Sequence, residues 1–314
     1  MKKDGNTRLT CNYQRLNDAT IIPVLPLPSI DELLDSLGGS KVFSVLDLAS
    51  GFFQAAIEPD SIPLTAACTQ TGLYERLRMP MGASGSPGCF QRLMAQVCEG
   101  LQRVQLHIDD IVVHSKSASH HAVDLRGFLA LLTEYNLKLS PKKAHIGAPE
   151  VQFLGHLVTP SGLRPDPKKI KAMLKMPMPS TKGELRSLLG SLSYLRKFLL
   201  SLSTTVKDLH SLLHKDVRLE FTAHYTAVAN KVLKQLVSSG VLAFPDYQAA
   251  IDDSRKFQLV TDASKEGFGA SLERKQPDGK IRSLYIRRTT LPSEKNWDTS
   301  ELECDALVWA AIKK

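Results

Sequence analysis

The chain has 314 residues, of which 43% are hydrophobic and 23% charged, a balance that excludes an intrinsically disordered protein. Its 40 Lys and Arg residues outnumber its 32 Asp and Glu residues, and the resulting net charge of +8 favours polyanionic partners, nucleic acid first. The five cysteines include no C-x-x-C pair, which argues against a disulfide framework and a structural zinc site. The sequence has no secretory signal, and no apolar run approaches the ~20 residues of a membrane span, which argues against a membrane partner. These features predict an intracellular protein, in the cytoplasm or the nucleus.

The first part of the chain predicts short helices and one buried strand. The stretch "SIDELLDSL" has a helical pattern that Gly38 and Gly39 end. "KVFSVLDL" is apolar nearly throughout and predicts a buried strand with Asp47 at its end. A second helix is expected in "SPGCFQRLMAQVCEGL", where Phe90 and Met94 recur at helical spacing.

Two short apolar runs, "VQLHI" and "IVVHS", are separated only by Asp109 and Asp110. Two strands joined by two residues predict a β-hairpin, with the aspartates as its turn. Taken alone, an Asp-Asp pair between strands is most often just a turn. The apolar flanks, however, place the hairpin in a packed sheet, and Asp47 ends another buried strand. Three carboxylates are therefore expected at the ends of neighbouring strands.

A pocket with three carboxylates is tolerable only if cations occupy it. Oxygen ligands that are few and partly open suit Mg²⁺. Two such ions about 4 Å apart can activate an attacking 3′-hydroxyl and hold a leaving pyrophosphate, which is polymerase or nuclease chemistry. The sequence contains no P-loop lysine motif, H-E-x-x-H or G-x-S-x-G that would favour another reaction.

The middle of the chain is predicted to be mainly helical. "HHAVDLRGFLALLTEYN" predicts a helix whose His120 and His121 are expected to be solvated or to neighbour the cap. "VQFLGHLVT" predicts one strand. Asp166 can cap a helix in "RPDPKKIKAML", and the capping box "TKGE" opens another. That helix has a leucine stripe and a basic face, which is as readily a solvated surface as a binding one.

The last part of the chain predicts a small sheet followed by a helix. "KFQLVTDAS", "GFGASLER" and "KIRSLYIRR" are typical of strands, and "QPDG" suits a turn between the last two. "SELECDALVWAAIKK" predicts the final helix.

A series of motifs, in order, closely resembles the reverse transcriptases of Ty3/gypsy-type LTR retrotransposons. These are "LDLASGFFQ", "MPMGASGSPGCFQRLM", "IDDIVVHS", "NLKLSPKK", "FLGHLVTPSGLRPDP", "LRSLLGSLSYLRKF", "TDAS" and "ALVWA". The resemblance covers essentially the whole chain. It implies an α+β fold: a right-hand polymerase, with fingers and palm over residues 1–160 and a thumb-like helical region over 161–240, followed by a partial RNase H-like α/β domain over 241–314.

The resemblance also implies an activity and its partners. An RNA-directed DNA polymerase would add dNTPs to the 3′ end of a DNA primer on an RNA or DNA template and would bind the RNA/DNA hybrid. It would use two Mg²⁺ ions, with Mn²⁺ as a substitute. Asp47, Asp109 and Asp110 match the catalytic triad and metal ligands of the family, with Asp47 and Asp109 as the main ligands.

Further positions match binding residues of the family. Phe52 matches the aromatic residue that rejects a ribose 2′-hydroxyl, although core packing is the other interpretation of Phe52 or Phe53. The remaining nucleotide-binding matches are Lys2, Lys3, Arg8 and Met81. The stretch that supports the primer matches His107, Phe153, Leu154, Gly155 and His156. The thumb contacts to template and primer match Arg186, Arg196 and Lys197.

In the last domain, Asp262 and Glu303 match two RNase H carboxylates, with Glu301 as a neighbouring alternative to Glu303. The chain stops after one helix of that fold, so we expect no RNase H activity from it. His107 stands where the family usually has tyrosine. The alternative function is a catalytically inactive or domesticated retroelement fragment that only binds nucleic acid.

Overall fold

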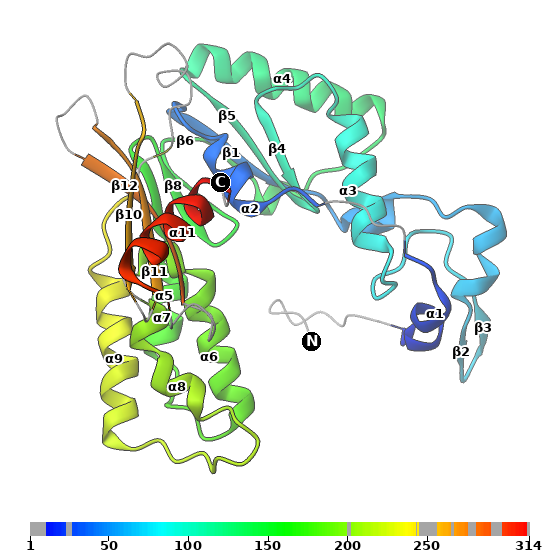
Figure 1. Cartoon of the computed structure of the whole chain (residues 1–314). Helices are drawn as coiled ribbons and strands as arrows, with labels where there is room; N and C mark the ends of the chain where they lie inside the picture. Colours follow the sequence, from blue (N-terminus) through cyan, green and yellow to red (C-terminus); the bar gives the residue numbers. More distant parts are fainter. Residues whose placement is uncertain are drawn as a thin grey trace. The chain divides into compact units, whose positions relative to one another are not determined.

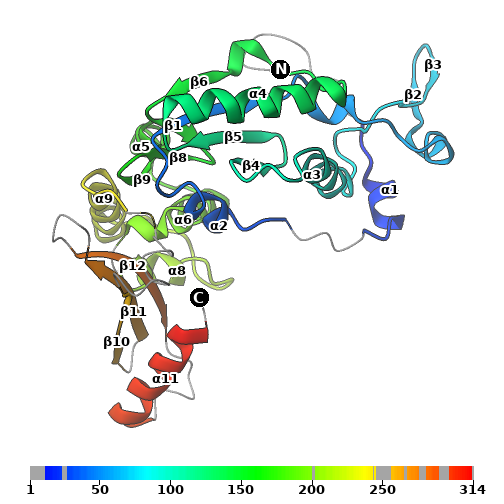
Figure 2. The same ribbon diagram turned by 90° about the horizontal axis from the view of Figure 1, so that it is seen from above.

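The computed structural model divides the chain into two compact units, Met1–Leu154 and Gly155–Lys314. The first unit is built around a four-stranded sheet, and the second contains a group of helices and a small sheet (Figures 1 and 2). The residues that the structure describes are 11–22, 27–199, 202–242, 244, 256–264, 267–275, 281–289 and 297–312.

The sheet of the first unit has the strand order β4-β5-β1-β6. Its strands are β1 (Val42–Asp47), β4 (Val104–His107), β5 (Asp110–Ser115) and β6 (His145–Ala148). The pairs β1–β5, β4–β5 and β1–β6 are all antiparallel. The predicted buried strand ending at Asp47 and the predicted hairpin are both confirmed.

The turn of that hairpin lies one residue earlier than expected. His107 pairs with Asp110, so Ile108 and Asp109 form the two-residue turn and Asp110 begins β5. Ile108 has φ 60°, a conformation that a β-branched residue rarely adopts. Its side chain nevertheless packs against the hydrophobic core. Burial of Ile108 thus outweighs the preference of Asp-Asp for the turn.

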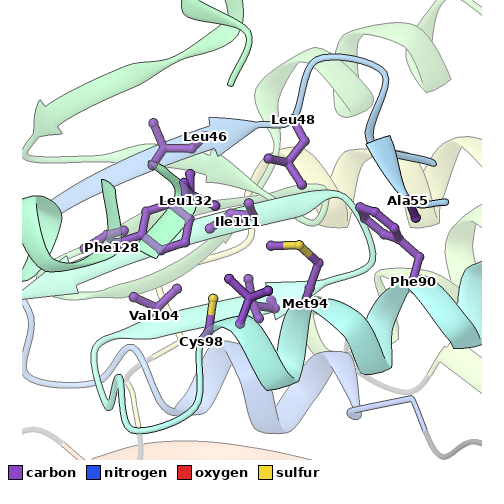
Figure 3. Close-up of a cluster of buried hydrophobic side chains, with 13 residues drawn as sticks. Leu46, Leu48, Ala55, Phe90, Met94, Cys98, Val104, Ile111, Phe128 and Leu132 are labelled. Atoms are coloured by element: carbon purple, nitrogen blue, oxygen red, sulfur yellow. The ribbon is translucent and has the colours of Figure 1, made fainter. Parts of the chain in front are cut away.

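Helices α3 (Ser86–Val97) and α4 (Ala118–Glu134) contribute to one buried cluster with the sheet (Figure 3). Phe90 and Met94 of α3 confirm the predicted helical face. The cluster comprises Leu46, Leu48, Ala55, Phe90, Met94, Val97, Cys98, Val104, Leu106, Ile111, Val113, Phe128 and Leu132. Full burial of a Leu, Ile, Val, Phe or Met side chain contributes about 2 kcal/mol, so this cluster stabilises the unit strongly.

The remaining elements of the first unit are short. They include α2 (Ile30–Asp35), which lies in the predicted stretch "SIDELLDSL" and ends two residues before the end of that stretch; Gly39 follows at φ 74°. The others are α1 (Gln14–Ala19), η1 (Gly51–Gln54), η2 (Pro59–Ser61), η3 (Pro63–Thr65), β2 (Ala67–Thr69), β3 (Gly72–Tyr74), η4 (Pro141–Lys143) and β7 (Val151–Phe153).

The stretch "VQFLGHLVT" is two strands rather than the single one predicted. β7 ends at Phe153, and β8 (His156–Thr159) begins three residues later. Leu154 and Gly155 lie between them with φ values of 43° and 64°, in the left-handed region that breaks an extended strand. A continuous apolar pattern cannot reveal such a bend when only one of its two residues is glycine.

His121 is buried rather than solvated, which corrects the expectation for the His120–His121 pair. Its Nε2 lies 2.7 Å from Ser44 Oγ, and its Nδ1 lies 3.0 Å from Ser115 Oγ. Ser115 Oγ also lies 2.6 Å from the carboxylate of Asp124. Serines on two strands supply partners that only the folded sheet brings together. His120 does neighbour the cap, since its backbone N–H donates to Ser117 Oγ.

A second buried histidine predicts that stability falls in acid. His114 is 1% exposed, and its Nδ1 lies 2.8 Å from Ser40 Oγ. Burial, reinforced by the positive charge of Arg103, lowers the pKa of His114 to about 4. An unfolded chain binds this proton at the ordinary histidine pKa of about 6.5. Unfolding therefore takes up a proton between these values, and acid in that range favours it.

From pH 7 to pH 5 we expect His114 to lower the free energy of unfolding by about 2 kcal/mol. Urea unfolding at both pH values should show this loss in the wild type and a smaller one in His114→Gln. His145→Gln, which changes an exposed histidine in the same sheet, should behave as the wild type. Equal pH dependence in His114→Gln and the wild type would contradict the prediction.

Helices dominate the first part of the second unit, after a hairpin of β8 and β9 (Gly162–Pro165). The helices are α5 (Pro167–Leu174), α6 (Lys182–Tyr194), η5 (Arg196–Phe198), α7 (Leu202–Thr205), α8 (Lys207–Ser211) and α9 (Ala223–Val237). Both predicted caps are confirmed: Asp166 accepts from the Lys168 backbone N–H, and Thr181 and Glu184 form a capping box.

The predicted leucine stripe of α6 is buried at Leu185, Leu188, Leu189 and Leu192. Met173, Leu188 and Leu233, one from each of α5, α6 and α9, line a small apolar cavity, and these three helices lie side by side in Figure 1. Of the two basic residues of α6, Arg186 is exposed, whereas Lys182 Nζ donates to the His214 and Lys215 carbonyl oxygens.

The last part of the second unit is a three-stranded sheet with a helix. The strands β10 (Gln258–Ser264), β11 (Gly267–Lys275) and β12 (Ile281–Thr289) pair in that order, and α11 (Thr299–Ile312) packs against β10 and β11. Phe268, Leu302 and Ala306 form their core. All three predicted strands and the final helix are confirmed; the "QPDG" stretch lies outside the described residues. Among the helices of the described ranges, none is long and apolar enough to cross a membrane.

Candidate active site

The pairing register of the central sheet sets the direction of two predicted catalytic side chains. Asp47 is paired with Asp110, and Asp110 is paired with His107. Directly paired residues share a face of a sheet, and successive residues alternate. Leu46 and Ile111, one residue away, both enter the cluster shared with α3 and α4. Asp47, His107 and Asp110 therefore lie on the opposite face, away from that core.

Asp109 is presented by the turn, and a buried glutamine holds this turn. Gln91 of α3 is 7% exposed. Its Oε1 accepts from the Ile108 backbone N–H at 2.5 Å, and its Nε2 donates to the Leu106 carbonyl oxygen at 3.3 Å. The amide thus binds the end of β4 and the first residue of the turn. Hydrogen bonds from a rigid helix stabilise the unusual φ of Ile108 and so fix the peptide that carries Asp109.

A lysine lies at the carboxylates. Lys143 Nζ is 2.8 Å from Asp47 Oδ2, with side chains that are 64% and 22% exposed respectively. The hydrogen bond to Asp47 raises the pKa of Lys143 despite some burial, and the charges of Asp47, Asp109 and Asp110 add to the effect. All three aspartates are thus close enough to act on the same ammonium.

The pKa of Asp110 is affected by the neighbouring negative charges at this end of the strands. Burial raises its pKa, and the negative charges of Asp109 and Asp47 raise it further. His107 and Lys143 act in the opposite direction. The two neighbouring carboxylates thus make ionisation of Asp110 harder, which is an electrostatic setting that favours binding of an added cation.

The chemistry of these donors fits Mg²⁺, because three carboxylates at the same end of neighbouring strands supply only oxygen ligands. In the ranges that the structure describes, no three His, Cys, Asp or Glu side chains yet converge closely enough to hold a metal ion. Asp47 instead has its carboxylate at Lys143. Metal binding would require the carboxylates to come closer together than they are here.

The nucleotide-binding predictions fall partly within the described residues. Phe52 lies in η1, five residues after Asp47, and packs edge-on against Phe90 with ring centroids 5.1 Å apart. Core packing therefore accounts for part of Phe52, while Phe53 is 38% exposed. Met81 is half-buried in the loop before α3. Lys2, Lys3 and Arg8 lie outside the described residues.

The predicted primer stretch is mostly buried. Phe153 is 2% exposed and His156 is 1% exposed. His156 lies against the rings of Tyr194 and Phe198, with centroids 5.5 and 5.7 Å away. Leu154 and Gly155 are only half-buried, so they are the part of this stretch that solvent reaches.

The predicted thumb cations lie on or just after α6. Arg186 and Arg196 are exposed, and Lys197 is half-buried with its Nζ 5.8 Å from the centroid of the Phe198 ring. Lys169 of α5 was not predicted. Its Nζ lies 4.4 Å from the centroid of the Tyr194 ring and occupies the space beside Gly155 that a Cβ would need.

The two predicted RNase H carboxylates lie on elements that pack together, Asp262 on β10 and Glu303 on α11, and both are exposed. Glu301 has a different role. Its carboxylate accepts from the Asp298 backbone N–H at 3.0 Å, while its own N–H donates to the Asp298 carboxylate at 2.8 Å. This reciprocal pair caps α11 and favours Glu303 as the carboxylate available for other contacts.

Sequence reasoning missed Gln91 and Lys143. A glutamine among the apolar positions of a predicted helix is a weak signal of a buried hydrogen bond. Lys143 lies in "NLKLSPKK", which carried part of the resemblance, but nothing in the sequence distinguishes it from Lys142 beside it. Only the pairing of distant segments shows which lysine meets Asp47.

Two family models match the chain. Residues 1–158 match the model described as reverse transcriptase (RNA-dependent DNA polymerase), and residues 221–314 match the RNase H-like domain found in reverse transcriptase. The sequence is 37% identical over 317 residues to the retrovirus-related Pol polyprotein from transposon opus of Drosophila melanogaster, covering 96% of this chain and 31% of that protein. It is 32% identical over 311 residues to the transposon Tf2-3 polyprotein of Schizosaccharomyces pombe, covering 98% and 23%. The chain thus spans about a third of the length of these relatives, or less.

Solved structures show the same fold. The foamy viral protease-reverse transcriptase in complex with double-stranded DNA matches with a TM-score of 0.89 at 23% identity, over 100% of this chain and 54% of that one. Its complex with an RNA/DNA hybrid matches with a TM-score of 0.84, over 96% and 40%. The expected α+β fold, a right-hand polymerase followed by an RNase H-like domain, is confirmed. The chain belongs to the reverse transcriptase (RNA-dependent DNA polymerase) family.

Proposed function

We propose that this chain is a retrotransposon-derived RNA-directed DNA polymerase, which adds dNTPs to a DNA primer on an RNA or DNA template. One observation carries the proposal: the sheet register sets Asp47 opposite Asp110, next to Asp109, at one exposed edge of the palm of a reverse transcriptase family member. The same edge would be costly for a protein that only binds polyanions, because it places negative charge where a phosphate backbone would approach.

In this reaction the primer 3′-hydroxyl attacks the α-phosphorus of a dNTP. A new P–O bond forms, the bond to pyrophosphate breaks, and the hydroxyl proton leaves to solvent. Asp47, Asp109 and Asp110 would hold two Mg²⁺ ions, with Mn²⁺ as a substitute; when bound, the ions activate the hydroxyl and stabilise the developing charge. Gln91 keeps the Asp109 peptide in place, so that the ligands are oriented before substrate arrives.

The proposed partners are an RNA template, a DNA primer, their hybrid and dNTPs. The foamy viral structures that share this fold contain double-stranded DNA in one case and an RNA/DNA hybrid in another. In this chain the exposed Arg186 and Arg196 are available to face backbone phosphates, a contact independent of sequence. Lys197 would likewise contact the template and primer, and the bend at Leu154 and Gly155 would support the primer. The incoming nucleotide would be bound by Lys2, Lys3, Arg8 and Met81. A site of action in the cytoplasm or nucleus is likewise a proposal.

Primer extension tests the function directly. The chain, a DNA primer and an RNA template should give extended products with dNTPs and Mg²⁺, none with excess EDTA, and products again when Mg²⁺ is restored. The alternative, a fragment that binds nucleic acid without catalysis, predicts a shifted primer–template band on a native gel and no extension under any metal. Family membership and the complete aspartate triad favour the polymerase.

Phe52 provides a test of substrate choice. If its ring lies beneath the incoming sugar, Phe52→Val should open space for a 2′-hydroxyl and raise rNTP over dNTP incorporation by about 10²-fold, measured as the ratio of kcat/KM values. Phe53→Val, which changes the exposed neighbour, should leave the ratio unchanged. An unchanged ratio in Phe52→Val, with dNTP addition intact, would assign Phe52 to core packing alone.

A further inference from the structure

Lys143 lies beside the aspartates in a segment that hydrogen bonds hold in place on its N-terminal side. Gln54 Nε2 donates to the Lys138 carbonyl oxygen at 2.9 Å, and the Lys138 backbone N–H donates to Gln54 Oε1 at 2.6 Å. The Ser140 backbone N–H donates to the Asp47 carbonyl oxygen at 2.8 Å. The chain before Lys143 is therefore attached to the residues that include and follow Asp47.

The segment is also held downstream. Strand β6 begins two residues after Lys143, and its His145 pairs with Val45 of β1. Between the two anchors the chain forms the short turn η4, Pro141–Lys143. The backbone of Lys143 is thus fixed beside the end of β1 whether or not its side chain meets Asp47. The ion pair is a consequence of the fold rather than a chance encounter of two surface chains.

We propose that Lys143 is a built-in counter-cation of the aspartate site: it holds the Asp47 carboxylate in the metal-free protein and gives it up when a divalent cation binds. The inference rests on the proposed function, because it takes Asp47 as a metal ligand. Three ionised carboxylates at one edge repel one another, and the ammonium offsets one of the three charges. A divalent ion brings twice that charge to the same oxygens and repels the ammonium.

The exposures of the two side chains make this exchange feasible. The Lys143 side chain is 64% exposed, so it can turn into solvent without disturbing the core. An exposed ion pair of this kind is weak, and the lysine therefore competes with the metal ion without excluding it.

The test is a titration of the full chain with Mn²⁺ in the absence of nucleic acid. The electron paramagnetic resonance signal of the free hydrated ion measures how much Mn²⁺ remains unbound. Lys143→Met keeps the length of the side chain and removes its charge. We expect it to bind Mn²⁺ about fivefold more tightly than the wild type, the upper range for loss of one exposed ion pair. Lys142→Met is the matched control, because Lys142 is in the same turn and, among the described residues, forms no ion pair with the three aspartates.

Thermal unfolding gives a second readout. In chelator, Lys143→Met should melt below the wild type because its carboxylates lack the counter-charge, and Mn²⁺ should raise its melting temperature more than that of the wild type. Equal or weaker Mn²⁺ binding by Lys143→Met would overturn the inference while leaving the proposed function intact. Asp109→Asn distinguishes the two: if it binds Mn²⁺ as well as the wild type does, the metal site itself is refuted, and the role of Lys143 with it.

Discussion

Asp109→Asn is expected to reduce primer extension on the order of 10³-fold, with kcat falling far more than the affinity for primer–template changes. The asparagine keeps the size and one oxygen of the side chain but lacks the negative charge that a divalent ion requires. Asp109 lies in the turn, with its neighbour Ile108 anchored to Gln91, so the substitution should leave the hairpin folded. The measurement is single-turnover extension of a DNA primer on an RNA template in Mg²⁺.

Asp60→Asn is the matched control for this change. Asp60 is an exposed aspartate in η2 of the same unit, with no part in the proposed site. It should extend the primer at the wild-type rate. If Asp109→Asn retained most of the extension rate, the paired aspartates would be an ordinary turn, and the alternative of nucleic-acid binding without catalysis would gain support.

Gln91→Leu is expected to lower kcat by about 10²-fold while leaving KM for dNTP near its wild-type value. Gln91 is a positioning residue: its amide holds the Ile108 N–H and the Leu106 carbonyl oxygen. Leucine fills the same space but leaves both backbone groups without this buried partner, at a cost of about 1–3 kcal/mol each. The turn should then relax from the left-handed φ of Ile108 and displace the Asp109 carboxylate.

The control for this substitution is Gln96→Leu, which places the same change on an exposed position of α3. It should match the wild type in extension. Gln91→Glu separates positioning from general destabilisation, because it retains the acceptor for the Ile108 N–H and should recover part of kcat. If Gln91→Leu lost kcat and folded protein in parallel, and Gln91→Glu recovered neither, Gln91 would stabilise the fold without positioning the Asp109 carboxylate.

Local patterns predicted much of the fold correctly. The apolar run before Asp47 is β1, the "TKGE" capping box opens α6, and Asp166 caps α5. Such elements are specified by residues within one or two turns of each other, so the sequence contains all the information needed. The helix α9 was predicted only as part of the thumb-like helical region over 161–240, without bounds of its own, because no distinctive motif marks it although Val232 and Leu233 belong to a buried helical face.

The aspartate triad could be predicted from the sequence because its chemistry is unusual: charged residues at the ends of apolar strands need an explanation wherever they occur. The position of the turn was not found, since Asp-Asp has the better turn propensity and only the core contact of Ile108 moves the register by one residue. The burial of His121 was missed for a similar reason, because Ser44 and Ser115 are far from it in sequence or on another element.

The sequence by itself determined the identity of the chemical groups: three carboxylates, their order along the chain and the apolar strands beside them. The tertiary structure alone decided which face of the sheet Asp47 and Asp110 share, which glutamine holds the turn and which of two adjacent lysines meets Asp47. The reason is physical. Strand pairing and core packing join segments that are many residues apart, and a shift of one residue in such a pairing turns a side chain from solvent to core.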